Sequence, residues 1–168
     1  MKELFKYTRV NVTVKDKETG KLLFEDHNLF VDTGRVFIAQ AIRGAISGAT
    51  INPLAFVCDL GDSGATPVLG DTDLTSPILD VCLPTIGSPA AFTGQPTGVI
   101  FNFSYTNSGA IDVTVRELGL FYRVDSNDFP KRGTPSTPGI MLARLKTTLS
   151  SIVISVSRTV TIEWKIIF

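Results

Sequence analysis

The last ten residues of the chain alternate between two sets of side chains, and only Ile167 departs from the pattern. One set is large and apolar: Val160, Ile162, Trp164, Ile166 and Phe168. The other set is mostly polar: Thr159, Thr161, Glu163 and Lys165. Successive side chains of a β-strand point to opposite faces, so this pattern predicts a strand with one buried face. A lone strand is not stable in water, and the chain must therefore build a sheet.

The composition extends this prediction to the whole chain. Val, Ile and Thr together make 48 of the 168 residues, whereas Glu, Gln and Met make 9. Branched side chains suit a pleated sheet, and good helix formers are scarce. The length suits a single core. We expect a mostly-β fold, an antiparallel β-sandwich or jelly-roll-like domain over residues 1–168, with one short helix near residues 33–43.

Residues 4–28 read as a β-hairpin with a polar turn at 15–20, and further strands are expected at 54–60, 77–83, 99–105, 111–122 and 140–147. Long loops are predicted at 61–76, 84–98 and 125–139. Asp32 or Thr33 can cap the helix and Gly44 can end it. The predicted core residues are Val10, Val12, Phe37, Leu118, Leu120, Ile162, Trp164 and Ile166.

Charge is balanced overall but unevenly distributed. The chain has 16 basic and 16 acidic residues, yet residues 44–115 contain six Asp and no Lys, Arg or Glu. A neutral chain lacks the long-range field that attracts nucleic acid, so nucleic acid is not expected as a partner. No signal peptide and no stretch of about 18 apolar residues is recognised, so we expect neither export by a cleaved signal nor a membrane span.

The sequence offers little for catalysis. Its one histidine, His27, lies beside Asp26 without a marked nucleophile, and no zinc spacing or phosphate-binding glycine loop is present. Cys58 and Cys82 lack the spacing of a metal knuckle or redox pair and are expected as buried thiols. The chain is therefore predicted not to be an enzyme and to need no cofactor.

Charged residues in two places could bind calcium or form ion pairs. The aspartates at 59, 62, 71 and 73 could supply oxygens to calcium, but they do not match an EF-hand and are also ordinary turn residues. Arg116 and Glu117 lie in an otherwise apolar strand, where an internal ion pair or an intersubunit contact is expected. The candidate subunit contacts are Asp62, Asp71, Asp73, Arg116 and Glu117.

The order of several motifs carries a resemblance. The chain reads Asn28-Leu-Phe-Val-Asp-Thr-Gly-Arg35 before the helix, then Leu60-Gly-Asp62, Arg116-Glu-Leu-Gly-Leu-Phe121, Met141-Leu-Ala-Arg144 and Ile162-Glu-Trp-Lys-Ile166. This set resembles small structural proteins of tailed bacteriophages, of the head-decoration, collar or tail-fibre-like kind.

The resemblance implies a β-rich module located in the virion after synthesis in the host cytoplasm, with no catalytic residues. It implies self-association, for which we expect a homotrimer, and binding to capsid, neck or tail proteins. The absence of heptads and fibre repeats favours a cement, decoration or collar role. The alternative is a tail-fibre or carbohydrate-binding module using the aromatic residues Phe92, Tyr105, Tyr122 and Phe129.

Overall fold

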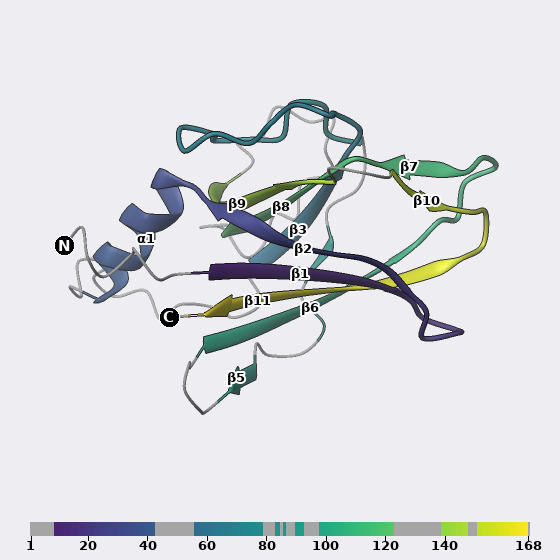
Figure 1. Ribbon diagram of the computed structural model, residues 1–168, viewed down its shortest axis with the longest axis horizontal. Helices are drawn as coiled ribbons and strands as arrows, with labels where there is room; N and C mark the ends of the chain where they lie inside the picture. The colour runs from purple at the N-terminus through teal and green to yellow at the C-terminus, as the bar shows by residue number, and fades with distance from the viewer. Residues whose placement is uncertain are drawn as a thin grey trace.

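The computed structural model describes residues 9–42, 56–78, 83–84, 86, 90–92, 98–122, 139–147 and 151–167, and these are mostly β-strand with one helix (Figure 1). The elements in chain order are β1 (Arg9–Asp16), β2 (Leu22–Phe30), α1 (Asp32–Ile42), β3 (Phe56–Gly61), β4 (Leu83–Pro84), β5 (Ala90–Phe92), β6 (Gly98–Thr106), β7 (Val113–Val115), β8 (Glu117–Tyr122), β9 (Ile140–Lys146), β10 (Ile152–Ile154) and β11 (Thr159–Ile167).

Nine strands form one antiparallel sheet in the order β4-β3-β8-β9-β2-β1-β11-β6-β5, and β10 pairs separately with β7. Strand β2 joins the two halves of the large sheet. Its residues 22–28 pair with β1, and its last residues, Leu29 and Phe30, pair with β9. The antiparallel, mostly-β prediction is confirmed.

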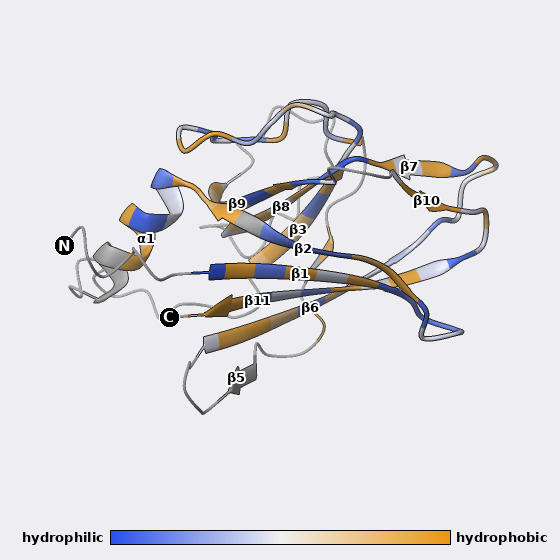
Figure 2. Ribbon diagram, in the orientation of Figure 1, coloured by the Kyte–Doolittle hydropathy of each residue, from blue (hydrophilic) through white to orange (hydrophobic). Residues whose placement is uncertain are grey.

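The inner faces of the two halves pack against each other. The Trp164 indole N–H on β11 donates to the Cys58 sulfur on β3 at 3.4 Å, and the rings of Phe56 and Phe101 lie 4.6 Å apart. Apolar residues alternate with polar ones along β1, as Figure 2 shows. The eight residues expected in the core are all buried, with at most 5% of their surface exposed: Val10, Val12, Phe37, Leu118, Leu120, Ile162, Trp164 and Ile166.

The hairpin and the helix lie close to where the sequence predicts them. Asp16 closes the hairpin turn, because its carboxylate accepts hydrogen bonds from the backbone N–H groups of Glu18 (3.1 Å) and Thr19 (2.8 Å). Gly20, at φ +68°, takes the left-handed conformation that completes the turn. The helix begins at Asp32, one residue before the predicted start.

The sequence predicts one strand wrongly and misses another. Residues 111–122 are not one strand, because the ladder stops at Arg116, whose N–H donates to Gly61 O and whose C=O accepts from Thr147 N, both at 2.8 Å. Strand β10 was not predicted, since three residues carry too little alternation to be recognised. Of the strand expected at 77–83, the described residues show a bridge at Pro77 and strand again from Leu83.

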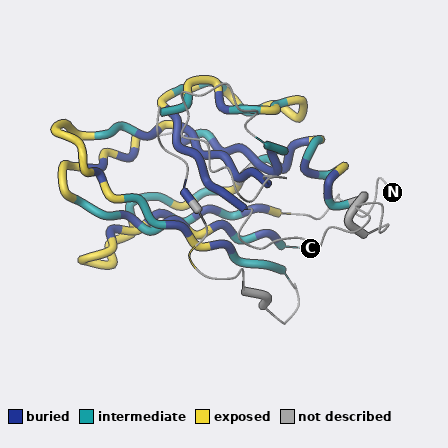
Figure 3. The backbone as a smooth tube through the Cα atoms, turned by 180° about the vertical axis from the view of Figure 1, so that it is seen from behind, coloured by how far each residue is buried: buried dark blue, intermediate teal, exposed yellow. Residues whose placement is uncertain are grey.

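Strands β3 and β8 are buried along their whole length, and β9 nearly so, so both faces of this half-sheet are covered (Figure 3). Helix α1 packs beside β9 and contributes Phe37 to the main core. Its Thr33 hydroxyl donates to Met141 O at 2.6 Å, and a Cβ on Gly34 would lie 2.4 Å from Leu142 O, so only glycine allows this approach.

Several predicted features lie outside the described residues: the loop at 125–139 apart from Gly139, much of the loop at 84–98, Gly44, Cys82 and Phe129.

Candidate functional site

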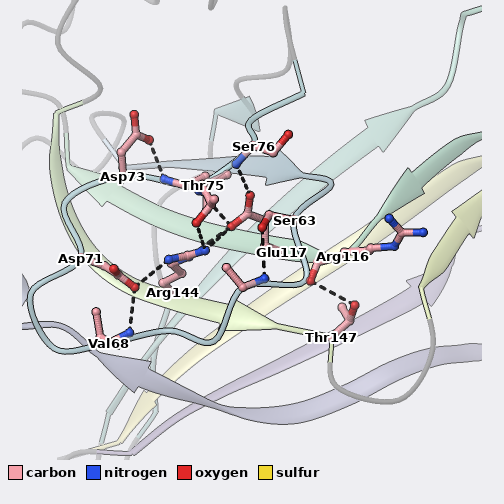
Figure 4. Close-up of polar contacts among 12 residues, drawn as sticks. Ser63, Val68, Asp71, Asp73, Thr75, Ser76, Arg116, Glu117, Arg144 and Thr147 are labelled. Atoms are coloured by element: carbon pink, nitrogen blue, oxygen red, sulfur yellow. Dashed lines mark hydrogen bonds and ion pairs between the residues drawn. The ribbon is translucent and has the colours of Figure 1, made fainter.

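The outer face of the β3-β8-β9 half-sheet carries a buried charged pair. Glu117 opens β8 and is fully buried, and Arg144 lies in β9 with 3% of its side chain exposed. Arg144 donates to Glu117 Oε2 from Nη2 at 2.6 Å and from Nε at 3.1 Å (Figure 4). Two charge-assisted bonds fix the guanidinium in one orientation.

The same two side chains bind residues 62–78, which we call the acidic loop. Arg144 donates from Nη1 to Asp71 Oδ2 at 2.7 Å and from Nη2 to Thr75 Oγ1 at 2.6 Å. The Glu117 carboxylate accepts from the backbone N–H groups of Thr75 (3.1 Å) and Ser76 (2.7 Å). The pair therefore satisfies its own buried charges and holds the loop against the sheet.

Glycine is needed beside this pair. A Cβ on Gly61 would lie 2.4 Å from Cγ of Glu117 and 2.5 Å from its Oε1. The Glu117 carboxylate cannot easily move aside, because both of its oxygens accept hydrogen bonds. Gly61 thus makes room for the buried carboxylate at the end of β3.

A second apolar cluster lies under the acidic loop, separate from the main core. It consists of Val31, Val57, Leu74, Phe121 and Met141, all at most 5% exposed. Leu74 is the acidic loop's contribution to this cluster. The loop is therefore held by apolar burial as well as by charge.

This arrangement changes the interpretation of the loop at 61–76, which carries three of the predicted subunit contacts, Asp62, Asp71 and Asp73. Most of it lies along its own sheet: Asp62 N donates to Ser76 O at 2.8 Å, and Ile78 N to Leu60 O at 2.8 Å. Glu117 is buried within the chain and presents no surface to a neighbouring subunit. Its partner is Arg144 rather than the adjacent Arg116.

The other four candidate contacts lie on or next to the acidic loop. Arg116 pairs with Asp62 at 3.2 Å, with about half of each side chain exposed. Asp71 pairs with Arg144 and has only 15% of its side chain exposed. The Asp73 carboxylate accepts a hydrogen bond from the N–H of Leu74 at 2.7 Å. Asp62 and Arg116 thus remain accessible to a partner.

The tip of the acidic loop is apolar and exposed. Val68 and Leu69 have 56% and 42% of their surface exposed. Asp71 fixes the turn, since its carboxylate accepts from Val68 N at 2.9 Å and its N–H donates to Val68 O at 3.1 Å. Leu69 O accepts from Asp32 N at the start of α1, at 2.8 Å. A continuous set of bonds therefore runs from Glu117 through Arg144 and Asp71 to the exposed tip.

Sequence analysis missed Arg144 as a site residue. The signal was available, because Arg144 interrupts the apolar strand Met141-Leu-Ala-Arg-Leu145 just as Glu117 interrupts its own strand. It also missed Asn107, which is 1% exposed and donates to Ile111 O and Ile154 O, both at 2.9 Å. Asn107 ties together the chain segments around the β7–β10 ribbon.

Within the described part of the chain, no group of three or more His, Cys, Asp or Glu side chains could hold a metal ion. His27 is exposed, and its Nδ1 lies 2.9 Å from Asn11 Oδ1. Among the aromatic residues considered for sugar binding, Tyr122 is buried, with its ring 4.6 Å from that of Phe37. No described helix is long and apolar enough to span a membrane.

A shallow groove of about 250 Å³ lies at the end of the hairpin. It is lined by Asp16, Thr19, Lys21, Leu23, Val153, Ile154, Ser155, Arg158 and Val160. The backbone N–H and the hydroxyl of Thr19 lower the pKa of Asp16, and Arg158 lowers it further. Arg158 forms ion pairs with both Asp16 and Glu18.

No family model, curated protein sequence or solved structure matches this chain.

Proposed function

We propose that this chain is a structural component of a bacteriophage particle, a decoration, cement or collar protein that binds capsid or neck proteins as a homo-oligomer, with a trimer expected. The motif order supports the proposal. Two of its motifs, Arg116–Phe121 and Met141–Arg144, supply Glu117 and Arg144, which form one buried pair. The motifs of the resemblance thus belong to one structural unit.

The observation that carries the proposal is the fixed shape of the acidic loop. A loop held by a buried ion pair and an apolar cluster presents Val68 and Leu69 in one conformation. A contact surface that is already ordered avoids much of the entropy cost of binding. Such a surface suits a protein that attaches permanently to a particle.

We also propose that the two halves of the large sheet are the layers of a β-sandwich. The Trp164–Cys58 contact and the tilted ring contact of Phe56 with Phe101 across the halves support this architecture. A compact double-layered module suits a cement or collar role better than a long fibre.

The test is attachment to particles. Particles of the virus whose genome encodes this chain are purified on a density gradient, and the chain is sought by mass spectrometry and by antibody labelling in electron microscopy. A protein present in the lysate but absent from purified particles would overturn the proposal.

The contact surface can be tested with particles that lack the chain. Recombinant chain is added back, and the double variant Val68→Ser/Leu69→Ser is compared with Ile111→Ser, a control at a position 77% exposed and far from the tip in sequence. The tip variant is expected to bind at least about 10-fold more weakly, because two apolar contacts of a buried interface are lost. Equal binding by both variants would exclude the tip as the contact.

A further inference from the structure

Exposed apolar side chains gather at one end of the molecule, where the acidic loop meets α1. Val68 and Leu69 are 56% and 42% exposed, and Val36 of α1 is 55% exposed. Leu69 O accepts from Asp32 N, and Val36 lies one helical turn beyond Asp32. The three side chains therefore lie close together, and we call Val36, Val68 and Leu69 the apolar tip.

The groove of about 250 Å³ lies at the other end, between the hairpin turn and β10. Figure 1 and the view from behind in Figure 3 both place α1 and the hairpin turn at opposite ends of the molecule. Val153 of β10 lines the groove with 52% of its surface exposed, and Leu22, next to the lining residue Leu23, is 48% exposed. The apolar tip of one chain lies at the opposite end from its own groove and therefore cannot enter it.

The groove has the size and the lining to receive apolar side chains. Ile154 and Val160 form part of its lining and belong to the main core. A cavity of about 150 Å³ holds a benzene molecule, so a groove of about 250 Å³ has room for the side chains of Val68 and Leu69. Packing them there would remove apolar surface of both partners from water.

The two ends carry opposite charge. The acidic loop, its ion-pair partners and the first turn of α1 include five acidic and three basic side chains: Asp32, Asp62, Asp71, Asp73 and Glu117 against Arg35, Arg116 and Arg144. The hairpin turn at 15–21 and Arg158 include four basic and two acidic side chains: Lys15, Lys17, Lys21 and Arg158 against Asp16 and Glu18. The tip end therefore has an excess of two negative charges and the groove end an excess of two positive charges, so the two ends attract each other.

We propose that the apolar tip of one copy packs into the groove of a second copy. A second copy is the partner because the chain presents both surfaces, one apolar and acidic, the other apolar and basic, at ends that cannot meet within one molecule. The inference rests on the proposed homo-oligomer and names the contact between its copies.

Such a contact joins two different surfaces and is therefore head-to-tail. Each copy uses its tip toward one neighbour and its groove toward the other, and head-to-tail contacts produce a ring where the rotation between copies closes. The proposed trimer is then a ring with three identical contacts. A tip variant also binds particles more weakly, because separate copies lose the combined attachment of the ring.

The experiment measures self-association of the full chain by analytical ultracentrifugation and light scattering. The tip variant Val68→Ser/Leu69→Ser and the groove variant Val153→Glu are each expected to raise the dissociation constant at least about 10-fold, because each removes one side of the apolar contact. Ile86→Ser is the matched control. Ile86 is 53% exposed, and its N–H donates to Asn102 O of β6, outside the groove lining, so this variant should associate like the natural chain.

Mixing the two variants gives the decisive measurement. The tip variant keeps its groove and the groove variant keeps its tip, so the mixture is expected to form dimers with one chain of each kind, although neither variant associates alone. Growth stops at the dimer, because the two surfaces that remain free are the altered ones. A contact between two identical surfaces would give no such restoration.

Two further variants keep the result clear. Lys21→Glu is expected to raise the dissociation constant roughly 3-fold, because it reverses an exposed charge at the groove, and an unchanged constant would overturn the role of charge. Melting curves establish that each variant is folded. If Val153→Glu prevents folding, Val153→Ser takes its place in the mixing experiment.

The outcomes separate this inference from the proposed oligomer. A stable oligomer that neither the tip variant nor the groove variant weakens overturns the tip–groove contact and leaves the oligomer in place. Weakening by both variants without dimers in the mixture also overturns the contact. Open filaments that both variants dissolve support the contact and overturn the trimer. A full chain that is monomeric at high concentration overturns both proposals.

Discussion

Removing the charge of Glu117 should loosen the acidic loop and destabilise the whole chain. Glu117→Gln keeps the size of the side chain but leaves Arg144, 3% exposed, without its main counter-charge. Breaking a buried pair by removing one partner costs about 3–5 kcal/mol. Asp71 still accepts a bond from Arg144 Nη1, so we expect the lower end of that range, about 3 kcal/mol.

That loss is large for this chain. Domains are stable by about 5–15 kcal/mol, and a loss of about 3 kcal/mol in a chain of this length lowers the melting temperature by about 6–12 °C. The assay is urea unfolding followed by Trp164 fluorescence, with the midpoint and slope fitted for each variant. Hydrogen exchange at the Thr75 and Ser76 amides should accelerate as well, because both donate to Glu117.

The control variant breaks an exposed ion pair next to the same strand, β8. Arg116→Gln removes one partner of the Asp62–Arg116 contact, in which both side chains are about half exposed. Exposed pairs contribute about 0–1 kcal/mol, so this variant should unfold close to the natural chain. If Glu117→Gln and Arg116→Gln shift the urea midpoint equally, the reasoning about the buried pair is refuted.

Three other predictions concern single positions. Gly61→Ala should cost about 1–3 kcal/mol in urea unfolding, because its Cβ would overlap Glu117, and an unchanged midpoint would mean the carboxylate moves freely. Trp164→Ala should cost about 3–5 kcal/mol, because the fully buried ring fills the centre of the core, and an unchanged melting temperature would contradict that packing. Asp16→Asn should destabilise the chain at pH 7. The fold lowers the pKa of Asp16 from its ordinary value of 3.8, so the ionised carboxylate stabilises the folded chain above pH 3.8. That stabilisation is lost as the pH falls through the lower pKa of the folded state. The unfolding free energies of the two chains should therefore converge at low pH, and a constant difference between pH 7 and pH 2 would show that the carboxylate charge is not involved.

The elements that the sequence predicts well are those with local signals. The alternation from Thr159 to Ile166 identifies β11 and its buried face without knowledge of any partner. Asp16 and Gly20 mark the hairpin turn through their own chemistry. In both cases the information lies within a few neighbouring residues.

The acidic loop could not be predicted in the same way, because its conformation depends on distant partners. Glu117 lies 41 residues from Ser76 and 27 from Arg144 along the chain. The sequence places Arg116 next to Glu117, but successive side chains of a strand point to opposite faces, so adjacency does not identify the partner. The choice is made by the strands: β8 and β9 pair with Gly119 opposite Arg144, which brings the guanidinium to the carboxylate.

The buried pair is better explained by specificity than by stability. Apolar residues of similar size can replace a buried ion pair at little or no cost in stability, so charge is not required simply to cover the half-sheet. Leu74 and its apolar neighbours could hold a loop there in many orientations, because apolar contacts are not directional. The hydrogen bonds from Arg144 to Asp71 and from Ser76 to Glu117 are directional, and they select one orientation, in which Val68 and Leu69 face solvent. Replacing both charges together, as Glu117→Gln/Arg144→Met, should therefore restore part of the stability lost in Glu117→Gln while leaving the amides of the loop tip exchanging faster than in the natural chain. Full recovery of slow exchange at the tip would show that the apolar cluster alone determines the loop.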